Sequence, residues 1–138
     1  MAEAKTIITR TFDAPARLVF EAWLDPAHLI HWHKGSPDWH TPFAESDGRA
    51  GGRFRIGYGS PDGKNDFTFE GVYNEVTPYS RIVFTIGDGR PVTLDFVEHD
   101  GKTTLTLVLT LEDIYSAEQQ REGWTQILIH LGQYLARL

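Results

Sequence analysis

The chain has 138 residues, of which 41% are hydrophobic and 23% are charged, as is typical of a folded globular domain. Thirteen basic against nineteen acidic residues give a net charge of −6, and Lys and Arg form no cluster, so nucleic acid is not an expected partner. The absence of cysteine excludes disulfides, thiolate metal ligands and cysteine nucleophiles. We therefore expect one domain over residues 1–138. We also expect it to be cytoplasmic and without membrane insertion, because no apolar run is long enough to span a bilayer and no signal peptide is recognisable.

The first third of the chain predicts one strand, two short helices and an irregular segment. Residues 5–12 favour a strand, and Asp13 with Pro15 then predicts a helix start, because Asp can cap free N–H groups and Pro suits the first turn. Asp25-Pro26 ends this helix and predicts a second one, to Ile30. Residues 31–50 mix Trp, His, Pro and Gly without periodicity, which is unusual for a connection inside a compact domain and more typical of a functional segment.

The remaining sequence predicts an antiparallel meander followed by a long helix. Five strand-like runs are separated by turn signals that include three Asp-Gly pairs; the runs cover residues 52–58, 66–76, 81–87, 91–99 and 103–111. Ser116 and Gln119 form a capping-box pattern before apolar residues spaced three and four apart, which predicts a helix of about 22 residues. Such a helix has about the length needed to cross a six-stranded sheet.

Several short segments, in this order, resemble those of a known family. The segments are Phe12-Asp-Ala-Pro15, Val19-Phe-Glu-Ala-Trp23, His31-Trp32-His33, Asp47-Gly-Arg-Ala-Gly-Gly-Arg-Phe54, Phe69-Glu-Gly-Val-Tyr73, Gly101-Lys-Thr-Thr-Leu105 and Gly123-Trp124. They are similar to motifs of the AHSA-type family, named after the activator of the heat-shock-protein ATPase, within the START-like or SRPBCC superfamily. The resemblance implies an α+β helix-grip (START-like/Bet v-like) fold. In this fold a curved six-stranded antiparallel sheet surrounds the long C-terminal helix, and two short helices follow the first strand.

The resemblance also implies a function, since members of the family are mostly binders of apolar ligands or proteins of unknown role, and some relatives in the superfamily are cyclases, hydrolases or lipid carriers. We therefore expect a small apolar or aromatic molecule as ligand, in a cavity between the sheet and the C-terminal helix, and no cofactor. Two alternatives stay open. One is a cyclase- or hydrolase-type enzyme that uses the same cavity with a His or Glu as acid-base group, such as His33 or Glu98. The other is an interaction domain, either a homodimer or a partner of a chaperone.

Large apolar side chains on the strand faces assigned inward are the candidate walls of this cavity. The candidates are Trp32, Trp39, Phe54, Ile56, Phe69, Tyr73, Phe84, Phe96, Trp124 and Leu128. The hydroxyl of Tyr73 and the indole N–H of Trp124 would be polar handles for a ligand. Trp32, Trp39 and Phe43 would form either a lid or a static plug at the cavity mouth.

Other patterns carry weaker chemical signals. His28, His31, His33 and His40 lie close together with Asp38, but no cysteine or HExxH arrangement accompanies them, so no metal is expected. The glycines from Gly57 to Gly63 have the wrong spacing for a phosphate-binding loop and predict a hairpin tip. Arg53 and Arg55 are predicted to face solvent and to pair with acids such as Glu70.

Overall fold

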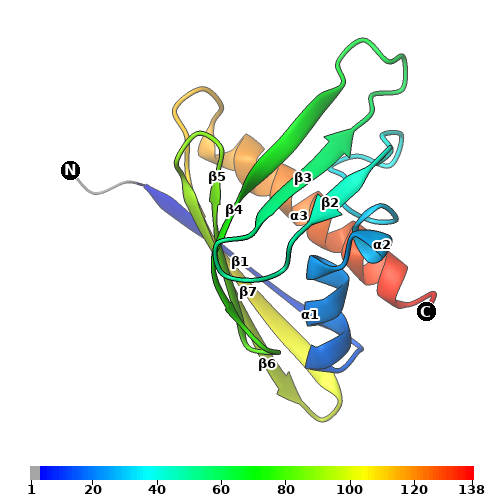
Figure 1. Cartoon of the computed structure of the whole chain (residues 1–138), viewed down its shortest axis with the longest axis vertical. Coiled ribbons are helices and arrows are strands. Elements are labelled where there is room, and N and C mark those ends of the chain that lie inside the picture. The colour runs from blue at the N-terminus through cyan, green and yellow to red at the C-terminus, as the bar shows by residue number, and fades with distance from the viewer. Residues whose placement is uncertain (1–3) are drawn as a thin grey trace.

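The computed structural model describes residues 4–138, which contain seven antiparallel strands and three helices joined by loops. The strands are β1 (Lys5–Phe12), β2 (Ala44–Ser46), β3 (Arg53–Tyr58), β4 (Phe67–Thr77), β5 (Arg81–Ile86), β6 (Pro91–His99) and β7 (Lys102–Thr110). The helices are α1 (Ala16–Leu24), α2 (Pro26–Leu29) and α3 (Ala117–Leu135). The sheet order is β1-β7-β6-β5-β4-β3-β2, so every neighbouring pair except β1 and β7 is consecutive in the chain (Figure 1).

The prediction of six strands is wrong by one, because β2 lies within the segment expected to be irregular. Its three residues pair with β3, with Ala44 opposite Ile56 and Ser46 opposite Phe54. A three-residue strand is too short to show an alternating pattern of its own, and the ladder with β3 defines it instead.

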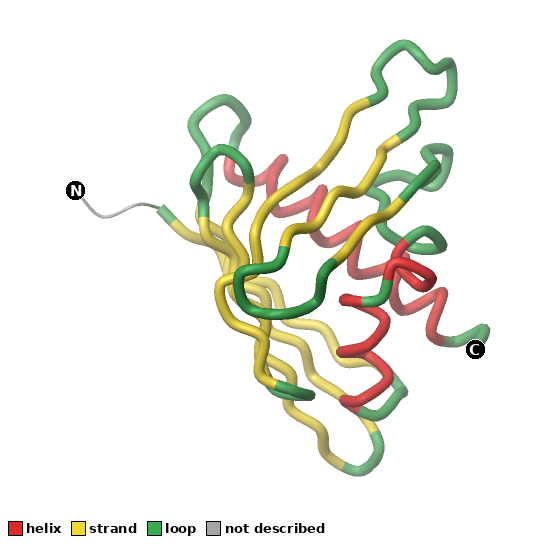
Figure 2. The backbone as a smooth tube through the Cα atoms, in the orientation of Figure 1, coloured by secondary structure: helices red, strands yellow, loops and turns green. Residues whose placement is uncertain are grey.

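The alternation of apolar residues places one face of the sheet against the helices. In β6 and β7, residues such as Leu94, Phe96, Leu105 and Leu107 are buried, whereas Val97 on the opposite face is 64% exposed. The three helices lie on the concave side of the strands, with α3 running the length of the sheet (Figure 2). Each buried leucine removes apolar surface from water and contributes roughly 1.5–3 kcal/mol, so this shared face is the main source of stability.

The start of α1 differs from its prediction. Asp13 does not cap the helix; Pro15 occupies the N-cap position and provides no side-chain hydrogen bond. The carboxylate of Glu98, on β6, instead accepts a hydrogen bond of 2.6 Å from the backbone N–H of Ala16. The cap of α1 therefore comes from a residue 82 positions away in the sequence, which also ties the helix to the sheet.

Local signals elsewhere are confirmed. Ser116 and Gln119 form the complete capping box of α3, although the helix has 19 residues and ends at Leu135, three residues short of the chain end. Asp100 and Gly101 both have positive φ angles, 56° and 76°, in the tight turn between β6 and β7. Within residues 4–138, no helix combines the length and apolar character that crossing a membrane requires.

Candidate ligand-binding site

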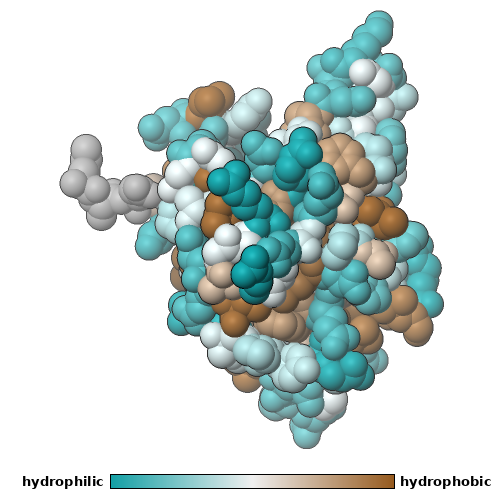
Figure 3. Space-filling view, in the orientation of Figure 1, coloured by the Kyte–Doolittle hydropathy of each residue, from teal (hydrophilic) through white to brown (hydrophobic). Residues whose placement is uncertain are grey.

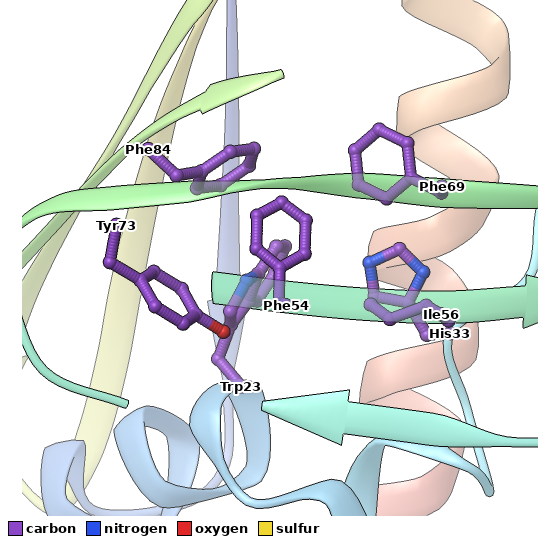
Figure 4. A pocket seen from close by; sticks show the side chains of 7 residues that line it. All are labelled: Trp23, His33, Phe54, Ile56, Phe69, Tyr73 and Phe84. Carbon is purple, nitrogen blue, oxygen red and sulfur yellow. The ribbon is translucent and has the colours of Figure 1, made fainter. Parts of the chain in front are cut away.

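An inner cavity lies between the sheet and the helices, and aromatic side chains nearly fill it. Its volume is about 10 Å³, enough for a single water-sized molecule. The residues that line it come from α1, the segment after α2, and strands β3 to β5: Trp23, His33, Phe54, Ile56, Phe69, Tyr73 and Phe84 (Figure 4). The rings of Phe54, Tyr73 and Phe84 pack with centroids 5.1–5.3 Å apart, as in the interior of a protein core. The inner cavity alone is thus far smaller than a ligand-sized pocket.

His33 is the most buried titratable group at this cavity. Its side chain is 1% exposed and its Nδ1 atom lies 2.6 Å from the hydroxyl of Tyr58. Burial lowers the pKa of His33 from 6.5 to about 3, because the charged imidazolium loses its hydration. The same desolvation raises the pKa of Tyr58, so both groups are neutral at physiological pH.

Tyr73 contributes a second polar atom. Its hydroxyl forms a hydrogen bond of 2.8 Å with the hydroxyl of Ser46 on β2. Burial raises the pKa of Tyr73 to about 12, against the lowering effect of this hydrogen bond. The short strand β2 therefore holds the polar end of Tyr73 in place.

A larger outer groove opens between the ends of strands β3 and β4 and the first half of α3. Its volume is about 340 Å³, within the range of small-molecule sites. One wall consists of Gly35, Tyr58, Phe67 and Phe69. The other wall consists of Tyr115, Gln120, Gly123, Trp124 and Ile127. Phe69 lines both spaces, so its ring is the partition between the outer groove and the inner cavity.

Cross-strand pairing explains the aromatic wall of the outer groove. Tyr58 on β3 lies opposite Phe67 on β4, and their rings stack with centroids 4.7 Å apart. Phe69 occupies the next inward position on β4 and meets Trp124 of α3 edge to face at 5.7 Å. The period of two along β4 therefore aims two aromatic rings at the same helix.

Gln120 and Tyr58, two of the polar residues that line the outer groove, are already engaged by the protein. The side-chain nitrogen of Gln120 donates to the carbonyl groups of Glu112 and Tyr115, at 3.1 and 2.8 Å, and its oxygen accepts from the N–H of Glu112. These bonds hold the loop before α3 that carries Tyr115. The hydroxyl of Tyr58 is bonded to His33. The groove consequently offers a molecule mostly apolar surface.

Gly123 keeps the groove open on the helix side. A Cβ atom at this position would have no heavy atom within 4 Å. A side chain added at this lining position would therefore begin in open space. Glycine is unfavourable inside a helix by roughly 0.8–1 kcal/mol, so its presence here costs stability while leaving space.

The sequence-based cavity residues divide into three groups. Phe54, Ile56, Phe69, Tyr73 and Phe84 surround the inner cavity, and Phe69 with Trp124 borders the outer groove. Trp32, Phe96 and Leu128 are buried in the core but line neither space. Trp39 is half-buried and packs against Phe67 and Tyr58, behind the groove wall.

The physical reasons for the second group are local contacts. The indole N–H of Trp32 donates to the backbone carbonyl of Ala22 at 3.0 Å, so this residue anchors the segment after α2 to α1. Phe96 lies against Phe20 of α1 at 5.6 Å, toward the other end of the sheet. Phe43, expected beside the tryptophans, is 37% exposed and lies under the guanidinium of Arg55.

The outer groove and the inner cavity are lined in part by residues that were not among the sequence-based candidates. Tyr58 and Phe67 share the inward face with Phe54 and Phe69, so the alternation along β3 and β4 contained the signal for both. Trp23 belongs to the apolar stripe of α1 and gave no sign of facing a cavity. Gly123 was visible only as half of a short Gly-Trp motif.

Other candidates for chemistry are placed apart. Glu98 caps α1 and His33 binds Tyr58, so the structure does not pair them as an acid-base couple. In the part of the chain that is described, no group of three His, Cys, Asp or Glu side chains could hold a metal ion. Arg55 faces solvent and pairs with Glu45 and Glu70 at 3.0 and 3.4 Å, as predicted.

The chain's geometry is closely similar to that of several solved structures. The AHSA1-like protein from Aeromonas hydrophila is 30% identical, with a TM-score of 0.91 over 97% of this chain and 93% of that one. Protein Chr148 from Cytophaga hutchinsonii is 34% identical, with a TM-score of 0.81 over 96% and 92% of the two chains. Protein NE0264 from Nitrosomonas europaea, at 21% identity, shares the fold with a TM-score of 0.86 over 99% and 97%. A search among curated proteins found no match.

A long helix gripped by a curved antiparallel sheet, with space between them, defines a helix-grip domain, a fold that serves ligand binding in general. Residues 13–136 match the family described as "Activator of Hsp90 ATPase homolog 1-like protein". The chain belongs to this family.

Proposed function

We propose that this protein binds a small, predominantly apolar, aromatic molecule in the outer groove, between Phe69 on the sheet and Trp124 on α3. The observation that carries the proposal is the groove itself, of about 340 Å³, with aromatic walls and with the side chains of Tyr58 and Gln120 already bonded to the protein. Filling such a space with an apolar molecule removes exposed aromatic surface from water, at roughly 25 cal/mol per Å². Edge-to-face contacts with the surrounding rings add to this gain.

Two further features support a ligand over a purely structural gap. Phe67 is 50% exposed and Tyr115 is 62% exposed at the groove, so large apolar side chains remain in contact with water beside it. In the space-filling view, apolar residues reach the surface below the polar tip of the β3–β4 hairpin (Figure 3). Gly123 leaves open a position where another residue would stabilise the helix.

Acid-base catalysis by His33 is the weaker interpretation of the same site. A general base works best when its pKa is near the working pH, and burial holds the pKa of His33 at about 3. A partner carboxylate that would raise this pKa is not bonded to the ring; the partner is the neutral hydroxyl of Tyr58. The site therefore fits ligand binding better than acid-base catalysis by His33.

The direct test is a titration with 1-aminoanthracene, whose fluorescence rises when it moves from water to apolar surroundings. We expect saturable binding of one molecule per chain. Gly123→Leu should weaken binding by about tenfold or more, a change of about 1.4 kcal/mol, because the new side chain occupies the groove. This variant should fold at least as stably as the parent, since a helical glycine is replaced by a good helix former.

The matched control is Glu122→Leu, which adds the same side chain one position earlier in α3, at an exposed site outside the groove. It should bind the probe like the parent protein. Equal binding by Gly123→Leu and the parent, or no saturable binding at all, would refute the proposal.

A further inference from the structure

Strand β1 is one edge of the sheet and pairs with a single neighbour, β7. The carbonyl group of Ala4 accepts a hydrogen bond from the N–H of Leu111, the residue that follows β7, whereas the carbonyl group of Ile7 accepts from a side chain of α3. In an antiparallel ladder, backbone groups point toward the partner strand at every second residue. Ile7, Thr9 and Thr11 therefore direct their N–H and C=O groups away from β7, to the edge of the sheet.

The first half of this edge is covered and the second half is not. Arg121 of α3 covers it at Ile7, where its guanidinium also donates to the hydroxyl of Thr6 at 3.0 Å. Among residues 4–138, no hydrogen bond from another segment reaches the outward backbone groups of Thr9 and Thr11. These N–H and C=O groups can pair with an added strand, which is how extended peptides bind at sheet edges.

A groove lies beside the uncovered half of β1, at the opposite end of α3 from the outer groove. Its volume is about 660 Å³, within the range of ligand sites, and we call it the edge groove. Residues 10–13 form one wall; the other consists of Ile129, Gly132, Gln133, Leu135, Ala136 and Leu138. Gly132 lies against the ring of Phe12, because a Cβ atom there would be 3.4 Å from two of its ring atoms. A strand added to β1 would therefore place alternate side chains between β1 and α3.

The charges in the edge groove favour a particular peptide sequence. Ile8 and Phe12 are buried on the inward face of β1, and alternation places Arg10 on the same face. Arg10 is nevertheless exposed, lines the groove and takes part in none of the ion pairs among residues 4–138. Asp13, at the end of the same wall, is exposed and takes part in none of them either. A guanidinium at this position is suited to pair with a carboxylate.

We propose that the edge groove binds an extended segment of a partner protein, which adds to β1 as a further antiparallel strand. Pairing of its central residue with Thr11 places the preceding residue beside Phe12 and the following residue opposite Arg10. The side chain beside Phe12 is apolar and the one opposite Arg10 is acidic. The residue before the apolar one is basic and lies near Asp13. This site is separate from the outer groove, so the inference does not depend on the proposed function.

The test is a nitrogen-15 NMR titration of the protein with the peptide acetyl-TKLTEVT-amide, which has this order of residues. We expect the amide signals of Thr9 and Thr11 to shift and their hydrogen exchange to slow, because both N–H groups gain an acceptor. The amide of Ile8 faces β7 and should change less. The peptide acetyl-TKLTKVT-amide should bind about fivefold more weakly, because it replaces an attraction to Arg10 by a repulsion.

Arg10→Glu should reverse this preference, so that the lysine peptide binds more tightly than the glutamate peptide; a misfolded protein would not produce such a reversal. The matched control is Arg53→Glu, which makes the same charge change at an exposed strand residue outside the edge groove and should keep the preference of the parent.

Two results would overturn the inference. Unchanged signals of Thr9 and Thr11, or equal binding of the two peptides to the parent, would leave Arg10 as a charge that keeps sheet edges of separate molecules apart. Signals of Thr9 and Thr11 that change with protein concentration in the absence of peptide would show that a second copy of the chain occupies the edge.

Discussion

Replacement of His33 by glutamine should remove a defined part of the protein's sensitivity to acid. The imidazole has a pKa of about 3 in the folded protein and 6.5 in an exposed peptide. As the pH falls below 6.5, the unfolded chain takes up a proton that the folded chain excludes, so the free energy of unfolding decreases. This contribution is fully present above pH 6.5 and is lost progressively down to about pH 3.

The magnitude follows from linkage. Between these pH values the slope is about 1.4 kcal/mol per pH unit for one proton. From pH 6.5 to about pH 4.5 the parent protein should lose about 2 kcal/mol of unfolding free energy through His33 alone. The loss is smaller than two full pH units would give, because at pH 6.5 only half of the unfolded chains carry the proton on this imidazole. The loss is still a substantial fraction of the 5–15 kcal/mol that stabilises a typical domain.

The assay is urea unfolding followed by tryptophan fluorescence at several pH values between about 4.5 and 7.5. Carboxylates titrate in the same range, so the informative quantity is the difference between the parent and His33→Gln. Glutamine can still accept a hydrogen bond from Tyr58 but cannot titrate. The difference should change by about 2 kcal/mol across the range and favour the variant at low pH.

Tyr58→Phe is the matched control for this prediction. It removes the hydrogen bond to His33 but leaves the imidazole buried, so it should lower stability by about 1 kcal/mol at every pH without altering the slope. Parallel curves for the parent and His33→Gln would contradict the reasoning. They would mean that the folded protein admits the proton, and that His33 is less desolvated than its environment indicates.

Three further predictions concern other contacts. Glu98→Ala should lower the free energy of unfolding by about 1–2 kcal/mol through loss of the α1 cap, and Glu98→Gln should recover part of it; equal stability of all three proteins in urea would contradict the capping role. Phe69→Ala should join the outer groove to the inner cavity and permit bulkier aromatic probes to displace 1-aminoanthracene, at a cost of roughly 2–4 kcal/mol in stability; unchanged probe selectivity would argue against the partition. Gln120→Leu should free the loop that carries Tyr115, raising hydrogen exchange of residues 112–115 and weakening probe binding severalfold; unaltered exchange would show that these bonds do not hold the loop.

The fold was predictable because its signals are local and repeated. Alternation along β6 and β7, the turn at Asp100-Gly101 and the capping box at Ser116 each define an element within a few residues. The features that escaped prediction depend on distant partners. Strand β2 is defined by its pairing with β3, and the cap of α1 comes from Glu98, which is 82 positions from Ala16 in the sequence.

The sequence allowed a prediction of which side chains of the candidate site point inward, but not of how much empty space remains between them. Alternation predicted an inward face for Phe54, Phe69 and Phe84, and all three side chains line the inner cavity. How far their rings fill the space depends on rotamers and on the curvature of the sheet, which the order of residues does not specify. The bond between His33 and Tyr58 joins residues 25 positions apart, one of them in the aperiodic segment, so no spacing rule could indicate it.

The central claim is that an apolar aromatic molecule occupies the outer groove. The most direct measurement is intermolecular nuclear Overhauser contacts between bound 1-aminoanthracene and the isotope-labelled protein. We predict contacts from the probe to Phe69, Trp124 and Ile127, which lie on opposite walls of the groove. Contacts confined to exposed apolar residues elsewhere, such as Ile7 and Val97 on the outer face of the sheet, would contradict it.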